Sequence, residues 1–245
     1  MWYSYCNPPS NYYLEVFFMY IAFIVILVLA GLFFGLKFTQ VTENNDPVMA
    51  VLFKGLTTVC CIVIAAIAVF HTTDRHFAVL LMFGLFFGFL GDELLALRFV
   101  FTEKFSLCFL SGAMSFLVGH VFYVIALYSI APKAWIAAIP LLIIAMLLEY
   151  QNSKKHDLKL GKLYFPLAGY CAFACFMGVS AVGTAIFNFS IGTLLFGIAG
   201  VSFIISDSIL SVQCFSGNPT NGKNRAVHIT YWLAQYLIAL SALFI

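Results

Sequence analysis

Two aspartates, Asp92 and Asp207, stand deep inside long apolar stretches of this chain. An ionised carboxylate at the centre of a membrane-spanning helix costs about 2.5–3.5 kcal/mol even on the most lenient scale. Glu93 and Lys54 lie at a similar expected depth, and the four groups together would cost on the order of 10 kcal/mol by simple addition. Because a protein is stable by only about 5–15 kcal/mol, such a load requires pairing, water or a function.

The two aspartates could perform general acid/base chemistry if they face each other. Two carboxyl groups in a medium of low dielectric do not both ionise readily, so one is expected to stay protonated. A protonated carboxyl beside an ionised one can donate a proton and stabilise the cation that results. The alternative for each aspartate is a structural hydrogen bond to a neighbouring helix, which a second acid at the same depth makes less attractive.

Lys54 and Glu93 are the charged residues closest to these acids in expected depth. Lys54 could neutralise an aspartate or hold a phosphate, and it could equally snorkel to the lipid headgroups. Glu93 directly follows Asp92 and therefore points about 100° away from it around a helix. We interpret Glu93 as a salt-bridge or rim residue, with Arg98 or Lys54 as its partner.

Two polar stripes lie on other apolar segments. His228, Tyr231 and Gln235 follow one another at helical spacing near the C-terminus, and His120 and Tyr123 form a comparable stripe in the middle of the chain. A lone buried histidine is more often a core residue than a catalyst, so His120 gains interest only from the neighbouring polar groups.

The composition identifies the kind of element that must position these groups. The chain is 63% hydrophobic and only 9% charged, whereas a soluble domain carries roughly 25% charged residues. This composition predicts an integral membrane protein. The net charge of +2 gives no support for a nucleic-acid partner.

Apolar segments of membrane-spanning length recur along the chain, and helix is the only structure that pairs every backbone amide within its own segment. We therefore expect an all-α protein with eight transmembrane helices in a single transmembrane domain, 1–245. The expected spans are 13–36, 48–70, 77–101, 105–130, 133–149, 164–186, 190–213 and 226–245.

The distribution of Lys and Arg predicts the orientation. Nine of the twelve lie in loops after odd-numbered helices, and these are Lys37, Arg98, Lys104, Lys154, Lys155, Lys159, Lys162, Lys223 and Arg225. The opposite side holds Arg75 and Lys133. The positive-inside rule then puts the nine in the cytoplasm and both termini on the non-cytoplasmic side. With this topology the polar groups of four helices share the cytoplasmic half of the bilayer.

A short internal repeat relates the two aspartates. Residues 90–95 resemble residues 205–210, and His120 and Gln235 each follow their aspartate by 28 positions. Because the third and seventh predicted helices run the same way, such a repeat would be parallel, with four helices in each half. It would place the two aspartates across the centre of the bundle from each other.

Several of these segments resemble those of a known family. Four of them are similar to the Gly-Asp, His-x-x-Tyr, Ser-Asp and closing Tyr-x-x-Ala-Gln motifs of the YhhN-like lysoplasmalogenase family, namely 86–95, 116–123, 203–210 and 231–238. Lys54 matches a lysine of that family's second helix, although Gly55 stands where a proline is expected.

The resemblance implies a membrane hydrolase that cleaves the vinyl ether bond of a lysoplasmalogen, giving a fatty aldehyde and a glycerophospho-base. Asp92 and Asp207 would be the catalytic pair. The supporting residues, which would hold the water, the headgroup or the carboxyls, would be Lys54, His120, Tyr123, Tyr231 and Gln235. The reaction requires no metal and no cofactor. The partners would be the lysophospholipid and the membrane lipids.

Two other functions fit the same pattern. Parallel repeats and intramembrane acids also suit a proton-coupled small-molecule transporter, and a non-catalytic lipid-binding protein could keep the same fold. The membrane could be a bacterial inner membrane or an internal eukaryotic one. Gly31 and Gly35 have the spacing of a lipid-facing homodimer contact.

Overall fold

The computed structural model describes residues 10–245, with side chains from residue 18 onward, and this part of the chain is helical without strands. The helices are α1 (Ser10–Glu43), α2 (Pro47–His71), α3 (Arg75–Ala96), α4 (Phe105–Ile130), α5 (Trp135–Lys155), α6 (Tyr164–Phe187), α7 (Ile191–Phe215) and α8 (Asn221–Ser241). Each contains a segment long and apolar enough to cross a membrane. The predicted fold class, an all-α membrane protein with eight spans, is confirmed for the described residues.

The helix ends differ from the hydropathy spans where polar residues continue a helix. α1 runs to Glu43, α5 runs to Lys155, and α8 already begins at Asn221. Hydropathy detects only the apolar part of a helix, whereas capping decides where the backbone enters it. The hydroxyl of Thr220 accepts a hydrogen bond from the backbone N–H of Lys223 at 3.2 Å, which starts α8 before its apolar stretch.

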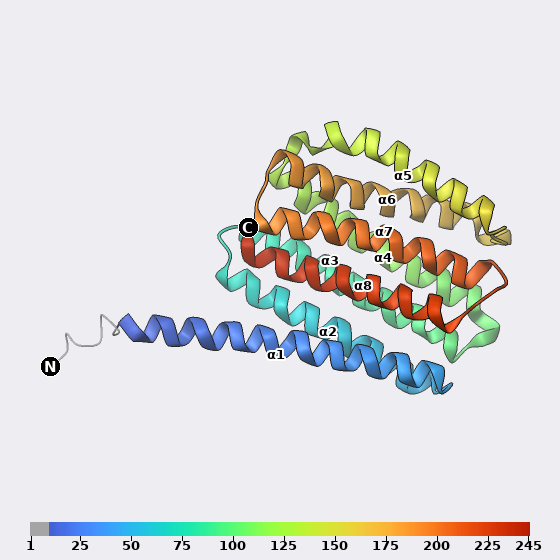
Figure 1. Ribbon diagram of the computed structural model, residues 1–245, viewed down its shortest axis with the longest axis horizontal. Coiled ribbons are helices and arrows are strands. Elements are labelled where there is room, and N and C mark those ends of the chain that lie inside the picture. Colours follow the sequence, from blue (N-terminus) through green and yellow to red (C-terminus); the bar gives the residue numbers. More distant parts are fainter. Residues whose placement is uncertain (1–9) are drawn as a thin grey trace.

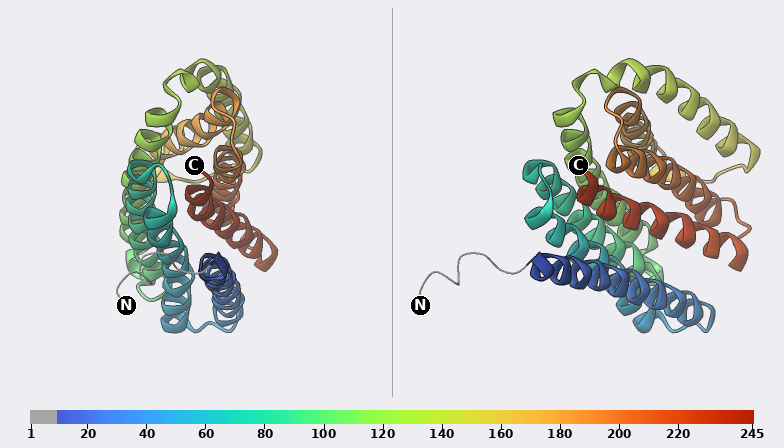
Figure 2. Two further views of the ribbon diagram at one scale, coloured as in Figure 1. Left: turned by 90° about the vertical axis from the view of Figure 1, so that its left-hand side faces the viewer. Right: turned by 60° about the vertical axis from the view of Figure 1, so that its left-hand side comes forward.

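Six helices form a closed ring, in which each packs against the next in the order α2, α3, α4, α6, α7 and α8, and α8 returns to α2. α1 packs on the outside against α2 and α8, and α5 packs on the outside against α6 (Figures 1 and 2). α3 and α7, which carry the two aspartates, therefore lie on opposite sides of the ring.

The two halves of the chain have matching neighbours. α1 covers α2 as α5 covers α6, and α4 packs against α6 as α8 packs against α2. A parallel repeat of four helices would produce this pattern, although the repeat itself stays a prediction. The loops at 44–46, 97–104, 156–163 and 216–220 share one end of the bundle, at the right in Figure 1. We call it the basic end, because its loops hold Lys104, Lys159 and Lys162.

Glycines on α3 allow its neighbours to come close. A Cβ at Gly84 would lie 2.1 Å from the ring of Tyr123, and one at Gly91 would lie 2.8 Å from the ring of Phe116. Both rings come from α4, so these glycines let that helix pack directly onto α3. A Cβ at Gly88 would lie 3.1 Å from Nε2 of Gln235, so the same stripe also admits a side chain of α8.

Gly31 and Gly35 do not face lipid. Both are buried, and a Cβ at Gly31 would collide with the hydroxyl of Tyr236, while one at Gly35 would lie 2.8 Å from the ring of Trp232. Both side chains belong to α8 of the same chain. The predicted dimer contact through these glycines is therefore wrong, because α8 already occupies this face of α1. Homodimer formation itself stays a prediction.

Candidate functional site

Asp92 lies at the centre of a buried polar cluster on α3 and has no solvent-exposed surface. Lys54 Nζ, from α2, lies 3.0 Å from Asp92 Oδ1. Thr58 Oγ1 donates a hydrogen bond to Asp92 Oδ2 at 2.5 Å, and Tyr231 Oη, from α8, donates to the same oxygen at 2.7 Å. Gln235 Nε2 in turn donates to Tyr231 Oη at 2.5 Å. Two helices, α2 and α8, thus supply partners to one carboxylate on α3.

This arrangement satisfies an ionised Asp92. One cation and two hydroxyl donors offset the cost of taking a carboxylate out of water. Lys54 is 3% exposed, so it belongs to the cluster and does not snorkel to the headgroups. Of the two alternatives expected for Glu93, a salt bridge or a rim position, the salt bridge is absent among the described residues, because Glu93 pairs with neither Lys54 nor Arg98. Glu93 is half-buried, and its carboxylate lies against Gly55.

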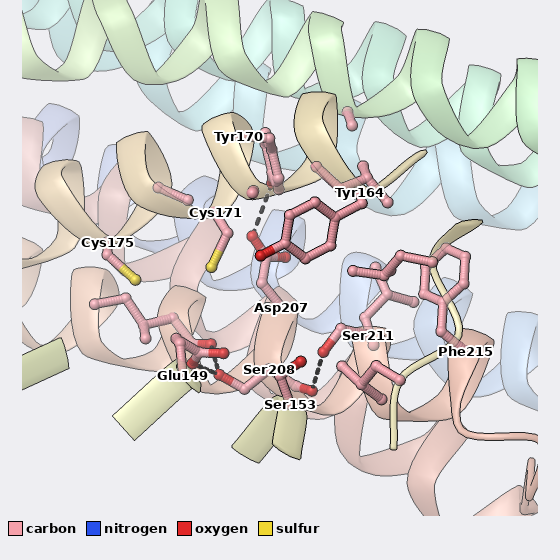
Figure 3. A pocket seen from close by; sticks show the side chains of 18 of the residues that line it. Glu149, Ser153, Tyr164, Tyr170, Cys171, Cys175, Asp207, Ser208, Ser211 and Phe215 are labelled. Carbon is pink, nitrogen blue, oxygen red and sulfur yellow. Dashed lines mark hydrogen bonds between the residues drawn. The ribbon is translucent and has the colours of Figure 1, made fainter. Parts of the chain in front are cut away.

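Asp207 lies in a second polar cluster, on α7. Tyr170 Oη, from α6, donates a hydrogen bond to Asp207 Oδ2 at 2.7 Å. The next residue, Ser208, donates through its hydroxyl to the carboxylate of Glu149 from α5. Figure 3 shows these side chains converging from three helices. Among the described residues Asp207 has no cationic partner, which distinguishes it from Asp92.

A cavity of about 230 Å³ lies against this second cluster, between α4, α5, α6 and α7. Most of its lining is apolar, and Figure 3 shows the polar side chains gathered along one part of its wall. These polar lining residues include Glu149, Ser153, Asp207, Ser208 and Ser211. An apolar chamber with a few convergent polar groups is the usual form of a small-molecule site.

A second cavity, of about 20 Å³, lies in the interior of the ring. Its polar lining consists of Lys54, Asp92, Ser206, Asp207, His228 and Tyr231. A water molecule needs roughly 10–15 Å³ and two to four polar partners. This small cavity therefore has room for one water molecule between the two aspartates.

Asp207 lines both cavities, whereas Asp92 lines only the small one. Leu95, Phe116 and Leu210 also border both, so they form an apolar wall between the two spaces. A group held in the large cavity would contact the carboxyl of Asp207 directly. A water molecule in the small cavity, beside Asp92, would lie on the other side of that carboxyl. The side-chain arrangement could therefore support proton donation from one side and water attack from the other.

In the described structure, His120 and Tyr123 form no hydrogen bond with either Asp92 or Asp207. Both are buried, and neither forms a hydrogen bond among the described residues. The ring of His120 stacks on that of Tyr170 at 5.9 Å, and it therefore touches the residue that binds Asp207. Tyr123 packs on Gly84 of α3. The supporting role of these two residues stays a prediction.

One family model covers most of the chain. The model of the YhhN family matches residues 49–242, from the first turn of α2 to the end of α8. The chain belongs to the YhhN family. No curated protein and no solved structure matches it.

The matched stretch of this YhhN protein contains both polar clusters and both cavities, while α1 lies outside it. α1 is one of the two helices that pack on the outside of the ring, and the other, α5, lies within the matched stretch. The match therefore covers all six helices of the ring.

Three residues of the second cluster, Tyr170, Glu149 and Ser208, are not predicted as site residues from the sequence. Nothing in the sequence distinguishes Tyr170 from the other aromatic residues of its apolar segment, and Glu149 lies at the end of the expected span 133–149. Ser208 belongs to one of the family-like motifs, 203–210. One signal was available: Glu149 and Ser153 are four positions apart and share a face of α5.

Proposed function

We propose that this YhhN protein hydrolyses the vinyl ether bond of a lysoplasmalogen to a fatty aldehyde and a glycerophospho-base. Membership of the family supports a lysoplasmalogenase-like role at the level of the family. The observation that carries the proposal is the position of Asp207, which lines both the apolar cavity and the water-sized cavity that it shares with Asp92.

The apolar cavity suits the vinyl ether end of the lipid chain. Its volume of about 230 Å³ lies below the 300–1,000 Å³ of typical ligand pockets, so it would hold only part of a long chain. The rest of the chain would extend past α5, the helix that covers this side of the bundle. This placement brings the double bond to the carboxyl of Asp207.

Asp207 is the better candidate for the acid. A vinyl ether is hydrolysed by protonation of the carbon remote from oxygen, which leaves an oxocarbenium ion. The proton donor must be a neutral carboxyl, and among the side chains that the structure describes Asp207 has one hydroxyl partner and no cation. Asp92, paired with Lys54, would remain the anion that stabilises the oxocarbenium ion.

The remaining steps balance with these two groups. Water in the small cavity adds to the carbon that bears the oxygen and gives its proton to Asp92, which forms a hemiacetal. In the collapse, Asp207 takes the hemiacetal hydroxyl proton and Asp92 returns its proton to the departing glycerol oxygen. One water molecule is consumed, and both carboxyls regain their starting protonation. Glycosidases use paired carboxyls for a related oxocarbenium problem.

The experiment is aldehyde release from a lysoplasmalogen by purified Asp92→Asn and Asp207→Asn variants. Each should lower kcat by about a hundredfold or more, the usual contribution of a positioned acid or base. Asp74→Asn is the matched control, because Asp74 caps α3 at the opposite end of the bundle and asparagine caps equally well. Wild-type turnover in either site variant would refute the assignment of that residue.

Two other functions remain as outcomes of measurement. Uptake of a solute into proteoliposomes without product would favour the transporter. A lysoplasmalogen that copurifies or binds but remains intact would favour the non-catalytic lipid-binding protein. The apolar lining of the large cavity favours a lipid over a hydrophilic solute in either case.

A further inference from the structure

Arg98 is a buried cation that has no polar partner in the part of the chain that the structure describes. It lies on the short 3-10 turn that follows α3, and it is 8% exposed. Among the described residues its guanidinium forms no hydrogen bond and no ion pair, and Nη1 is fully buried. Its contacts are aromatic: Cζ lies 4.8 Å from the ring centroid of Phe99 and 6.0 Å from that of Phe109.

His228 presents a second set of unpaired polar atoms nearby. It is 3% exposed, and neither ring nitrogen has a hydrogen-bond partner in the described part of the chain. Its ring lines the water-sized cavity and packs against Phe38 and Trp232. Lys54 lines the same cavity as His228, and so does Leu95, which lies one turn before Arg98 in the chain.

These groups leave an excess of positive charge at this end of the site. Lys54 is balanced by Asp92, but within residues 18–245 Arg98 forms no ion pair, with Glu93 or with any other acid. A cation–π contact compensates only a small part of the cost of burying a guanidinium. A buried cation whose donors are unsatisfied is therefore best explained by an anion that binds there.

We propose that Arg98 and His228 bind the phosphate group of the lipid substrate. This inference depends on the proposed function and deepens it, because it assigns the headgroup end of the site. A guanidinium matches the oxygens of a phosphodiester with its fork of N–H donors, and a neutral imidazole can add one further donor. Lys54 contributes to the same positive field while it stays paired with Asp92.

The spacing along α3 fits a glycerophospholipid. Arg98 follows Asp92 by six positions, which corresponds to about 9 Å toward the basic end at roughly 1.5 Å per residue. The glycerol unit joins the ether oxygen to the phosphate over a comparable short span. Phe109, which contacts Arg98, also lines the large cavity, and Leu95, one turn before Arg98, borders both cavities. A lipid with its ether at Asp207 would therefore direct its phosphate toward Arg98.

The test measures binding and needs no turnover. The ligands are a saturated 1-O-alkyl lysophospholipid, which cannot be hydrolysed at its ether, and the 1-O-alkylglycerol of the same chain length, which lacks the phosphate. Both are titrated into the wild-type protein in lipid nanodiscs. The lysophospholipid should bind about 10-fold to 100-fold more tightly, as expected for charge-assisted hydrogen bonds. Equal affinities in the wild-type protein would overturn the proposal without any variant.

Variants then assign the preference to named residues. Arg98→Gln should remove most of the preference for the lysophospholipid over the alkylglycerol, because it weakens lysophospholipid binding and leaves alkylglycerol binding unchanged. Arg98→Lys should keep part of this preference. His228→Phe, which retains a ring of similar size, should reduce it by a smaller factor. Lys104→Gln, which removes an exposed cation at the basic end, is the matched control and should leave it intact. A full preference in Arg98→Gln would refute the assignment.

A third ligand distinguishes the source of the phosphate. Inorganic phosphate alone should bind far more weakly than the lysophospholipid, because it gains nothing from the apolar cavity. Phosphate that binds as tightly as the lipid, and that loses this affinity in Arg98→Gln, would overturn a lipid headgroup as the ligand. If the wild-type protein releases no aldehyde from a lysoplasmalogen but still binds the lysophospholipid more tightly than the alkylglycerol, the proposed hydrolase activity is refuted while the phosphate site is supported.

Discussion

Asp92 and Asp207 come from opposite sides of the helix ring, yet both line one cavity with room for a single water molecule. Their surroundings differ, because Asp92 is paired with Lys54 while Asp207 has the hydroxyl of Tyr170. Two carboxyls that line the same cavity but have different bonding partners can take different roles in one reaction. The predictions below follow from this difference.

Removal of one partner of the Lys54–Asp92 ion pair should destabilise the protein more than removal of both. Lys54→Met leaves a buried carboxylate without its cation and should destabilise the protein by about 3–5 kcal/mol. The double variant Lys54→Met/Asp92→Leu should recover most of this loss but remain inactive, because its catalytic carboxylate is gone. Thermal unfolding in detergent and aldehyde release check the two parts. A single variant as stable as the wild type would contradict the prediction.

Tyr170 should affect turnover more than stability. Tyr170→Phe removes the one hydroxyl that donates to Asp207, and it should cost about 0.5–1.5 kcal/mol, or up to roughly tenfold in kcat. Tyr128→Phe removes a hydroxyl that pairs with Ser180, away from both cavities, and serves as the control. Equal activity of the two variants would show that Tyr170 does not position the acid.

The large cavity should determine the accepted chain length. Ala174 lines it and is 3% exposed, so Ala174→Phe would fill part of its volume. The KM for a long-chain lysoplasmalogen should rise several-fold, while a short-chain analogue, which needs less of the cavity, should be affected less. Steady-state kinetics on the two substrates provide the comparison. An equal rise in KM for the long-chain and the short-chain substrate would contradict the prediction, because it would indicate a general distortion of the protein and not a filled cavity.

The contact between α3 and α4 should tolerate no added side chain. A Cβ at Gly119 would lie 2.8 Å from the carbonyl oxygen of Gly84, so Gly119→Ala should destabilise the protein by about 1–3 kcal/mol. Gly169→Ala is the matched control, because a Cβ there meets nothing within 4 Å. That variant should be neutral or slightly more stable, since alanine favours a helix. Thermal unfolding of both variants decides between these outcomes.

The membrane class and the spans could be predicted because a bilayer leaves few alternatives. With no water to pair backbone amides, each apolar segment of sufficient length must be a helix. The ends were less predictable, since α8 begins at Asn221 after a cap by Thr220 that hydropathy does not detect. The neighbour that each helix face contacts was harder still to predict. Gly31 and Gly35 have the spacing of a dimer contact, but α8 of the same chain covers them.

The sequence by itself determined which residues were costly to bury, above all Asp92, Asp207 and Lys54, because each is a charged group in an apolar segment. Only the tertiary structure decided what surrounds them. It paired Lys54 with Asp92, gave Asp207 an apolar cavity, and left Arg98 buried without a counterion among the described residues. Depth follows from position along one helix, whereas a side chain's partners depend on how several helices are rotated against one another, and contacts distant in sequence set that rotation.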